Sequence, residues 1–295
     1  MLTIGREHHV FSYSAHHPPV AKLGAGEPVL LQTTYAFGDQ PLNPGDTLAD
    51  VDLALCDPLT GPLYVEGAEP GDTLAIHIDE VEPTDAGAQG VIPDFGVLEW
   101  DRLPLHFFTP EGSKVRWLRG LEYELRPNVG AIGVAPKEGE IPSVYPGDHG
   151  GNMDMKHIRA GATVLLPVWH PGAILFVGDC HQRQGDGELP GCVAETNANV
   201  TLRVDVLKGK MIKRPRVLTE DRLMLVASAK TLDEAVKIAV RDTVDMLMEE
   251  KGFDEDDAYL FTGIWCDAEI CQVVDPLKTA RVALDRQFYE ELQPA

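Results

Sequence analysis

Hydrophobic and polar residues alternate over short runs through most of the chain, which predicts β-strands separated by turns. Residues 74–78 show the pattern, because Leu74, Ile76 and Ile78 fall on one face and His77 falls on the other. Glycine and proline punctuate these runs, as is typical of proteins built from many short strands. Other runs that indicate strands span residues 29–34, 127–136, 198–206 and 223–227.

One later segment follows helical rather than strand spacing. Apolar residues recur at every third or fourth position between residues 232 and 247. Thr231 and Glu234 form a capping box at its start, and Gly252 suits its end. We therefore expect a long helix over residues 232–250. A second helix is expected from about residue 254 to 266, followed by a strand over residues 270–274.

These patterns predict a mainly β protein with two regions. Residues 1–227 form a β-rich region that carries the candidate site, and residues 228–295 form an α+β section that packs on it and does not fold independently. Residues 84–145 are rich in glycine and proline and are expected to form a lid or wall over a pocket. Five positive charges between residues 208 and 216 are expected to form a solvated face or a subunit contact.

Composition and charge narrow the classes of function. The chain has 295 residues, of which 44% are hydrophobic and 24% charged, as in typical globular proteins. With 25 Lys and Arg against 47 Asp and Glu, its formal net charge is -22, which repels nucleic-acid phosphates and anionic membrane surfaces. A small neutral substrate meets no such repulsion. No apolar run reaches the roughly 20 residues that span a bilayer, and the N-terminal segment lacks a signal-peptide core, so we expect a cytoplasmic protein.

The cysteines support the same compartment. They are odd in number and match no zinc-finger spacing. We therefore expect reduced thiols, most of them small buried side chains. The five are Cys56, Cys180, Cys192, Cys266 and Cys271.

Candidate chemistry is concentrated between residues 144 and 195. Glycines are interspersed there with acidic, basic and metal-ligating side chains, and they let the backbone bend sharply between them. Such a segment is typical of an active site. Its chemically capable residues are Asp148, His149, Asn152, Asp154, Asp179, His181, Asp186, Glu188 and Glu195.

Asp179 and His181 are the first candidates for metal binding. They follow an apolar run at positions i and i+2, so on an extended backbone both side chains leave the same face. A carboxylate and an imidazole placed in this way suit zinc or another divalent metal. Asp148 and His149, in a glycine-rich turn, are the candidates to complete the ligand set. Three protein ligands and one water are the usual arrangement of catalytic zinc.

Two glutamates are candidates for proton transfer. Glu188 closes a turn with glycines at 185 and 187, where it can act as general base toward water and then as general acid toward a leaving amine. Glu66 ends an apolar strand and precedes a glycine, which can direct it toward a site. For both residues the alternative is an acid exposed to solvent. The sequence leaves open which of them is the general base.

Cys180 carries an alternative mechanism. It lies between the two candidate ligands, and strand alternation turns it away from them. A cysteine nucleophile needs a base beside it, and His181 and His170 are the candidates.

Four segments resemble the acetamidase/formamidase family. The resemblance runs from about residue 25 to about residue 285, and its central motifs are long and ordered. Cys180 and the pair Gln182–Arg183 depart from it, because many members have small residues there. The segments span residues 60–72, 147–154, 178–188 and 272–277.

The resemblance implies hydrolysis of short aliphatic amides, of the formamide or acetamide type, to a carboxylate and ammonia in the cytoplasm. It implies a homodimer or larger homo-oligomer, with zinc, or else calcium, in the site. It also implies a jelly-roll-like β-sandwich core, a smaller β-barrel-like part and a C-terminal α+β section with one long helix. By position, Asp148, His149, Asp179 and His181 match the metal motifs, Glu66 and Glu188 match acidic positions, and Asn152 and Asp154 match the Gly-Gly-Asn-Met-Asp motif.

The leading hypothesis is therefore a metal-dependent amidase. Backbone N–H groups at Gly150 and Gly151, together with Asn152, are the candidates to bind the substrate and the developing oxyanion. Two alternatives stay open, a thiol amidase that uses Cys180 and a non-catalytic binding protein in which a metal ion only joins loops. The sequence does not say whether the amide is formamide, acetamide or a lactam. No nucleic acid or membrane partner is expected.

Overall fold

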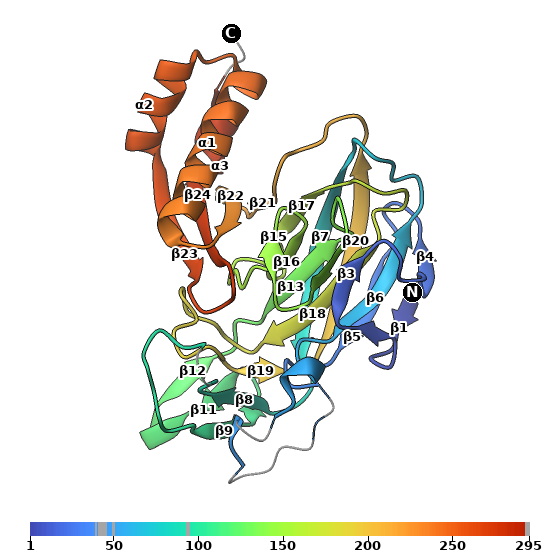
Figure 1. The fold of residues 1–295 in the computed structure, drawn as a ribbon, viewed down its shortest axis with the longest axis vertical. Coiled ribbons are helices and arrows are strands. Elements are labelled where there is room, and N and C mark those ends of the chain that lie inside the picture. Colours follow the sequence, from blue (N-terminus) through green and yellow to red (C-terminus); the bar gives the residue numbers. More distant parts are fainter. Residues whose placement is uncertain (39, 41–45, 49–50, 93–94, 293–295) are drawn as a thin grey trace.

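The computed structural model describes residues 1–38, 40, 46–48, 51–92 and 95–292, and it is built mainly of β-strands, as the sequence predicts (Figure 1). Two large sheets dominate the described residues. The first has nine described strands in the order β1-β5-β20-β7-β17-β21-β22-β24-β23. These strands are β1 (Leu2–Ile4), β5 (Val29–Thr33), β20 (Ala198–Leu207), β7 (Thr73–Pro83), β17 (Thr163–Pro167), β21 (Arg216–Leu218), β22 (Arg222–Ala229), β24 (Lys278–Asp285) and β23 (Cys266–Gln272).

The second large sheet carries most of the central stretch. Its main path runs in the order β15-β16-β13-β18-β19-β8-β9, and β6, β2 and β4 join it beside β18. The strands are β15 (Pro146–Gly147), β16 (Gly150–Asn152), β13 (Asn128–Val134), β18 (Leu175–His181), β19 (Glu195–Thr196), β8 (Gly87–Gly90), β9 (Leu105–Phe108), β6 (Leu59–Val65), β2 (His9–Val10) and β4 (Ala21–Leu23).

Two small sheets and two short 3₁₀ helices complete the described β-rich part. One small sheet has the order β10-β11-β12, and the other pairs β14 with β3. Their strands are β10 (Pro110–Glu111), β11 (Lys114–Arg116), β12 (Glu122–Glu124), β14 (Glu140–Pro142) and β3 (Ser12–Ser14), and the 3₁₀ helices are η2 (Leu53–Leu55) and η3 (Leu118–Gly120).

One hydrophobic core joins the two large sheets. Inward-facing side chains of the nine-stranded sheet, such as Ile76 and Leu202, pack in the same buried cluster as Ile132 and Val177 of the other sheet. Each inward position alternates with an outward one, so the period-two pattern of the sequence is what builds this sandwich. The outward His77 contacts Asp205 with Nε2 to Oδ2 at 3.0 Å, on the face that alternation predicts.

The long helix is confirmed. Helix α1 spans Leu232–Lys251, and the side chain of its N-cap residue Thr231 accepts a hydrogen bond from the backbone N–H of Glu234. Gly252 ends it with a left-handed φ of 73°. The second predicted helix is α2 (Glu255–Trp265), and a short helix, α3 (Arg286–Glu291), follows β24. No helix in the described part of the chain combines the length and apolar character that a membrane crossing requires.

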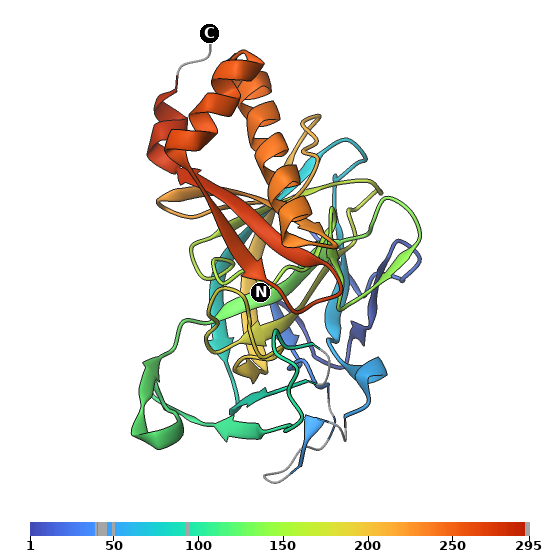
Figure 2. The same ribbon diagram turned by 60° about the vertical axis from the view of Figure 1, so that its left-hand side comes forward.

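The strand predicted over residues 270–274 is β23, which begins and ends earlier. It starts at Cys266, directly after α2, because it pairs antiparallel with β24 from Cys266 opposite Leu284 to Gln272 opposite Thr279. Figure 2 shows this red hairpin reaching from the helices to the body of the molecule. The hairpin therefore carries the C-terminal residues toward the two sheets.

The nine-stranded sheet continues through both predicted regions. Strand β22 crosses the expected boundary at residue 227 and pairs with β24, with Ala227 opposite Ala280. The strands of the α+β section thus extend the sheet of the β-rich region rather than forming a separate one. The division at residue 227 itself stays a prediction, and residues 293–295 of the second region lie outside the described residues.

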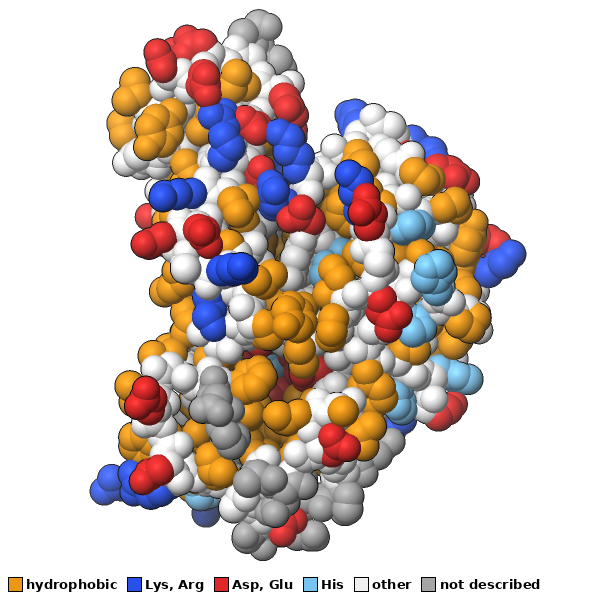
Figure 3. Space-filling view, viewed as in Figure 1, with side chains coloured by type: hydrophobic (Ala, Val, Ile, Leu, Met, Phe, Trp, Pro, Cys, Tyr) orange, Lys and Arg blue, Asp and Glu red, His pale blue; other side chains and the backbone are white. Residues whose placement is uncertain are grey.

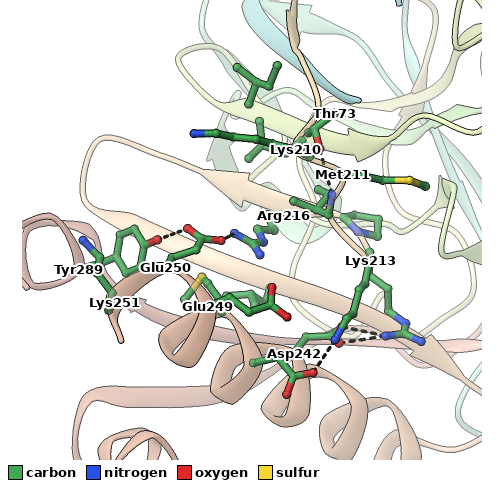
Figure 4. A pocket seen from close by; sticks show the side chains of 18 residues that line it. Thr73, Lys210, Met211, Lys213, Arg216, Asp242, Glu249, Glu250, Lys251 and Tyr289 are labelled. Atoms are coloured by element: carbon green, nitrogen blue, oxygen red, sulfur yellow. Dashed lines mark hydrogen bonds and ion pairs between the residues drawn. The ribbon is translucent and has the colours of Figure 1, made fainter. Parts of the chain in front are cut away.

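The basic segment of residues 208–216 packs against α1 instead of forming only a solvated face or a subunit contact. Lys213 pairs with Asp245 at 2.7 Å, and Arg216 pairs with Glu250 at the same distance. Figure 4 shows Lys213, Arg216 and Glu250 along the cleft between the β core and the helix. The cleft has a volume of about 760 Å³, and its charged residues are largely paired with one another. This segment therefore joins the helical part to the sheet.

Candidate active site

A small pocket lined by acidic residues lies beside strands β18 and β19 of the second sheet. Its volume is about 40 Å³, which is room for only a few water-sized groups. Figure 3 shows acidic side chains at the bottom of a hollow whose visible sides are largely hydrophobic. The acids that line it are Asp57, Asp154, Asp179, Glu188, Glu195 and Asp275, and the apolar lining includes Ala36, Phe37, Ile92, Phe95 and Val144.

Distant parts of the chain supply these acids. His181 is the last residue of β18 and Glu195 is the first residue of the adjacent β19, and sheet pairing places them directly opposite each other. Asp179 lies two residues before His181 in the same strand. Asp154 follows β16, which pairs with β13 beside β18. Asp275 comes from the turn between β23 and β24, where the side chain of Gln272 accepts hydrogen bonds from the backbone N–H groups of residues 274 and 275. The pocket therefore forms only when both predicted regions are together.

Four pocket acids have an unusual backbone. Asp57, Asp154, Asp179 and Glu188 have φ angles of 51°, 44°, 44° and 50°. This left-handed region is uncommon for residues other than glycine and is costly for a Glu. Strain of this kind persists where the surroundings enforce it, and such positions cluster at functional sites.

His181 is the basic centre of the cluster. Its Nε2 lies 3.1 Å from Oε2 of Glu195, 3.2 Å from Oδ2 of Asp179 and 3.8 Å from Oδ1 of Asp154. On the other side of the ring, Nδ1 contacts Nδ2 of Asn128 at 3.1 Å. The imidazole is fully buried, so the amide and the carboxylates fix its orientation.

Burial and neighbouring negative charges raise the pKa values of several of these acids, so these groups hold a proton more readily than usual. Burial, reinforced by the neighbouring Asp179, raises the pKa of Asp154, and burial with the Asp154 charge raises the pKa of Glu188. Burial raises the pKa of Glu195 to about 7 although His181 opposes the shift. For Asp179 burial opposes ionisation, but the charge of His181 and hydrogen bonds from His181, Glu195 and Asp154 together lower the pKa. So many buried carboxyl groups require protons or cations to balance their charge.

An amide network holds Glu188 in the pocket. Nε2 of Gln184 donates to Oε2 of Glu188 at 3.1 Å and to the backbone oxygen of Asp154 at 2.8 Å. Oε1 of Gln184 accepts from Nδ2 of Asn128 at 2.7 Å. Gln184 thus connects Glu188 to the residue that contacts the His181 ring, and it fixes one carboxylate oxygen of Glu188.

The residues present fit a bound divalent cation. Two groups share His181, one with Asp154 and Glu188 and one with Asp179 and Glu195, and within each group the ligand atoms lie within 4.8 Å of one another. The buried atoms Oδ1 of Asp154, Nε2 of His181 and Oε2 of Glu195 make no hydrogen bond of regular geometry among the described residues, although Nε2 of His181 and Oε2 of Glu195 lie within ion-pair distance of each other. Carboxylate and imidazole atoms that converge in this way are the donor set of a zinc or calcium site.

Gly130 provides the space next to this cluster. A Cβ atom at this position would lie 2.1 Å from Oδ2 of Asp179 and 2.5 Å from Oδ1 of Asp154. Both distances are far below van der Waals contact, so any side chain here would displace the carboxylates. Strand β13 can therefore pass this close to the two carboxylates only with a glycine at position 130.

The structure brings Asp179, His181 and Glu188 together but places Asp148 elsewhere. Asp148 is half exposed, and its Oδ1 accepts from Nε of Arg214 at 2.9 Å. His149 is buried beside the ring of Tyr13, with a centroid distance of 4.6 Å, and burial lowers its pKa to about 4. Neither residue lines the pocket or belongs to the two candidate ligand groups.

Glu66 and the two candidate oxyanion glycines also lie outside the pocket lining. Glu66 is exposed at the end of β6, as its alternative reading as a solvated acid predicts. Gly150 and Gly151 pair with Gly133 and Ile132 in the sheet. The third candidate, Asn152, does line the pocket, and its Nδ2 donates to Oδ2 of Asp275 at 3.3 Å.

The candidate thiol is directed away from the pocket. Cys180 is completely buried in the main hydrophobic core, and burial raises its pKa to about 12. Cys192 does line the pocket, but burial and then the charge of Glu195 raise its pKa well above the usual value. Neither environment favours the thiolate that a cysteine nucleophile needs.

Sequence reasoning missed several pocket residues. Asp57 and Asp275 were not among the predicted site residues. Each begins an Asp-Pro-Leu triplet, and this repetition is the signal by which the sequence could have revealed them. Asp154 and Glu195 lie in the central stretch but no spacing rule selected them as ligands. The expected wall was found in part, since Ile92, Phe95 and Val144 of the glycine- and proline-rich segment line the pocket.

A mainly β sandwich that buries a histidine and several carboxylates around a small pocket brings together groups that can bind a metal ion or transfer protons in an enzyme. The profile of the Acetamidase/Formamidase family matches residues 7–141 and 135–289, so the chain belongs to that family, whose members are hydrolases of amide carbon–nitrogen bonds.

Solved structures of the same length share the fold. An acetamidase from Bacillus halodurans superposes with a TM-score of 0.96 at 36% identity, covering 99% of both chains. A predicted acetamidase/formamidase from Thermoanaerobacter tengcongensis gives the same TM-score and identity, covering 99% of this chain and 97% of that chain.

Curated relatives are more distant and longer. A putative formamidase from Schizosaccharomyces pombe is 28% identical over 258 residues, which are 65% of this chain and 63% of that protein. The chain spans 56% to 63% of the length of the curated relatives that it matches.

Proposed function

We propose that the protein hydrolyses short aliphatic amides, of the formamide or acetamide type, to a carboxylate and ammonia. The observation that carries the proposal is the pocket of about 40 Å³ in which several carboxyl groups face an apolar wall. This space suits an amide with one or two carbon atoms beside an attacking water. The family membership and the two full-length structural relatives support the same reaction.

We propose Glu188 as the group that moves the proton. It takes a proton from the attacking water and delivers it to the departing nitrogen, which leaves as ammonia. Burial and the neighbouring Asp154 charge raise its pKa well above the usual value, which favours a group that both takes and returns a proton, and Gln184 holds one of its oxygens. Glu66 is the weaker candidate because it is exposed at a strand end.

His181 is the residue proposed to hold a divalent cation, together with Asp179, Asp154 and Glu195. The chemistry that such a cation supplies when bound is polarisation of the amide carbonyl and ionisation of water near neutral pH. We propose zinc first, because an imidazole takes part, and calcium as the alternative, because carboxylates dominate. The expected contributions of Asp148 and His149 remain predictions. Asn152 replaces the backbone of Gly150 and Gly151 as the preferred donor to the developing oxyanion, because only Asn152 lines the pocket.

The partner that we propose is a second copy of this chain. Helix α2 exposes Tyr259, Leu260 and Ile264 by 64%, 69% and 80% of their surfaces, and Trp265 lies beside them. The neighbouring β23 is the last strand of the described nine-stranded sheet, so apart from the bridge between Gln272 and Gly187 its outer edge has no described partner strand. An apolar helix face beside a free sheet edge is typical of a subunit interface. We place the enzyme in the cytoplasm, where the five free cysteines stay reduced.

The proposal is tested by ammonia release from formamide, acetamide, propionamide and a small lactam. The protein is assayed as purified, after chelation, and after zinc or calcium is restored. We expect turnover of the smallest amides, loss on chelation and recovery with one ion. We also expect Glu188→Gln to lower kcat by about 100- to 10,000-fold, to a residual rate that can still be measured, while Glu66→Gln and Cys180→Ser retain full activity.

Other outcomes point to the alternatives. Activity that survives chelation but not Cys180→Ser would establish the thiol amidase. Absence of ammonia under every condition, with a melting temperature that falls on chelation, would establish a binding protein whose ion joins loops.

A further inference from the structure

The turn that presents Glu188 is held from the C-terminal hairpin. Gly187 and Glu188 have φ angles of 94° and 50°, so the turn ends with two left-handed residues, one of which is not glycine. Such a conformation is unfavourable by itself and needs external contacts to persist. Contacts from the C-terminal hairpin supply this constraint in two parts.

Part of the constraint comes from the backbone of β23. The N–H of Gly187 donates to the oxygen of Cys271 at 2.8 Å, and the N–H of Val273 donates to the oxygen of Gly187 at 3.1 Å. Gly187 therefore forms a parallel bridge opposite Gln272. The turn therefore adds one bridged residue to the edge of the sheet, just before Asp275.

The other part is an ion pair between the buried Arg281 and the partly exposed Asp186. Nη2 of Arg281 lies 3.0 Å from both carboxylate oxygens of Asp186. Asp186 also accepts from Nζ of Lys156 at 2.6 Å, at the surface. Two cations thus hold the side chain that lies two residues before Glu188.

Arg281 is well placed to act as a rigid anchor. Its side chain is 1% exposed, although it carries a full positive charge. Its remaining donors reach Oε2 of Glu269 at 2.7 Å and the backbone oxygen of Ile270 at 2.8 Å. Since these partners lie on the facing strand β23, the guanidinium cannot move without breaking the hairpin.

We propose that Arg281 and Asp186 are positioning residues for Glu188. The guanidinium of Arg281 holds the carboxylate of Asp186 in place. Asp186 in turn holds the turn in the conformation that directs Glu188 into the pocket. Neither residue lines the pocket, so both act through Glu188 rather than on the substrate. This inference rests on the proposed role of Glu188 in amide hydrolysis.

The matched control is Arg222. Its Nη2 reaches Oε1 of Glu269 at 2.7 Å, so it belongs to the same ionic network without contacting Asp186. We expect Asp186→Asn and Arg281→Met to lower kcat for formamide about 10- to 100-fold with little change in KM, because Glu188 is misplaced. Arg222→Met should lose stability but keep kcat within about twofold of the wild type.

The deciding measurement combines these variants with Glu188→Gln. If Asp186 acts only through Glu188, Asp186→Asn lowers kcat in the wild type but causes no further loss in the Glu188→Gln protein. An equal loss in both backgrounds would show a merely structural role and overturn the proposal. Unchanged kcat in both Asp186→Asn and Arg281→Met would overturn it as well.

Hydrogen exchange provides a second test that does not need activity. Amides of residues 184–188 should exchange faster in Asp186→Asn and Arg281→Met than in Arg222→Met, and equal exchange in all three would contradict the proposal. Failure of the proposed function is separate, because it appears as full activity of Glu188→Gln or as no ammonia release by the wild-type protein.

Discussion

At the scale of single residues, the left-handed backbone of four pocket acids limits which substitutions are informative. Asn tolerates a positive φ better than most residues, so Asp154→Asn and Asp179→Asn remove charge with little added backbone strain. An Ala substitution at the same positions removes the carboxylate and also adds strain. Loss of activity in an Asn variant is therefore the clearer sign of a chemical role.

His149 gives a pH-dependent prediction. Burial lowers its pKa to about 4 in the folded protein, whereas a histidine in the unfolded chain titrates near 6.5. The unfolded state thus binds the extra proton between these values, and stability is lost as pH falls from about 6.5 to about 4. For the chelated protein the loss from this group should reach about 3 kcal/mol at pH 4.

The measurement is urea unfolding at several pH values. His149→Gln, which cannot be protonated in this range, should lose less stability than the wild type on going from pH 7 to pH 4. His8→Gln serves as the control, because His8 is about half exposed at the surface. Parallel pH profiles for wild type and His149→Gln would contradict the prediction.

The residues that the sequence could reveal are those close together in the chain. The i, i+2 spacing selected Asp179 and His181, and glycine flanks selected Glu188, and the structure places all three in one cluster. The glycine-rich turn around it selected Asp148, but an ion pair with Arg214 holds that residue at the surface. Asp275 could not be found by spacing, since only strand pairing brings it to the pocket.

At the scale of elements, helix α1 shows how strongly local signals determine a boundary. Its N-cap, apolar spacing and C-terminal glycine all agree, and the observed helix matches the prediction to within one residue at its C-terminal end. Strands β15, β16 and β19 escape the same reasoning because each has only two or three residues. Their positions depend on neighbours in the sheet rather than on their own sequence.

Thr231 allows the cap of α1 to be tested. Its hydroxyl oxygen accepts from the N–H of Glu234 at 3.2 Å, so Thr231→Ala leaves that donor without its side-chain partner. We expect a loss of about 1 kcal/mol in the free energy of unfolding, or about 2 °C in Tm. Thr231→Ser keeps the oxygen and should lose much less. Equal losses in thermal unfolding of both variants would show that the hydroxyl does not contribute.

At the scale of the whole molecule, the apolar face of α2 predicts self-association. Ile264 is 80% exposed, and we expect Ile264→Glu to shift a dimer to monomers, because it places a charge in the interface. Light scattering after size-exclusion chromatography measures the mass over a range of concentrations. Leu121→Glu, at a leucine 60% exposed in the loop before β12, is the control and should remain dimeric.

Two results would contradict this assignment. A wild-type protein that is monomeric at all concentrations would exclude the second copy as partner. A dimer that is unaffected by Ile264→Glu but lost in Leu121→Glu would place the interface on the other side of the molecule.

The mainly β architecture could be predicted because period-two alternation covers many strands. The order in which the strands pair within the sheet could not be predicted. The composition changes from β-rich to α+β near residue 227, which favours a boundary there, whereas β22 and β24 pair across it along eight residues each. Pairing between distant strands is determined by the shared core rather than by any local pattern.

The position of Asp275 has a consequence for biosynthesis. Among the described pocket residues it is the last to be translated, and the anchor Arg281 follows it. The sandwich of the first sheets can begin to form while the ribosome is still adding these residues. Until they emerge, the pocket lacks Asp275, and the turn that presents Glu188 lacks its bridge to β23 and its ion pair with Arg281. We therefore expect the site to become complete only after the final hairpin has left the ribosome and joined the sheet.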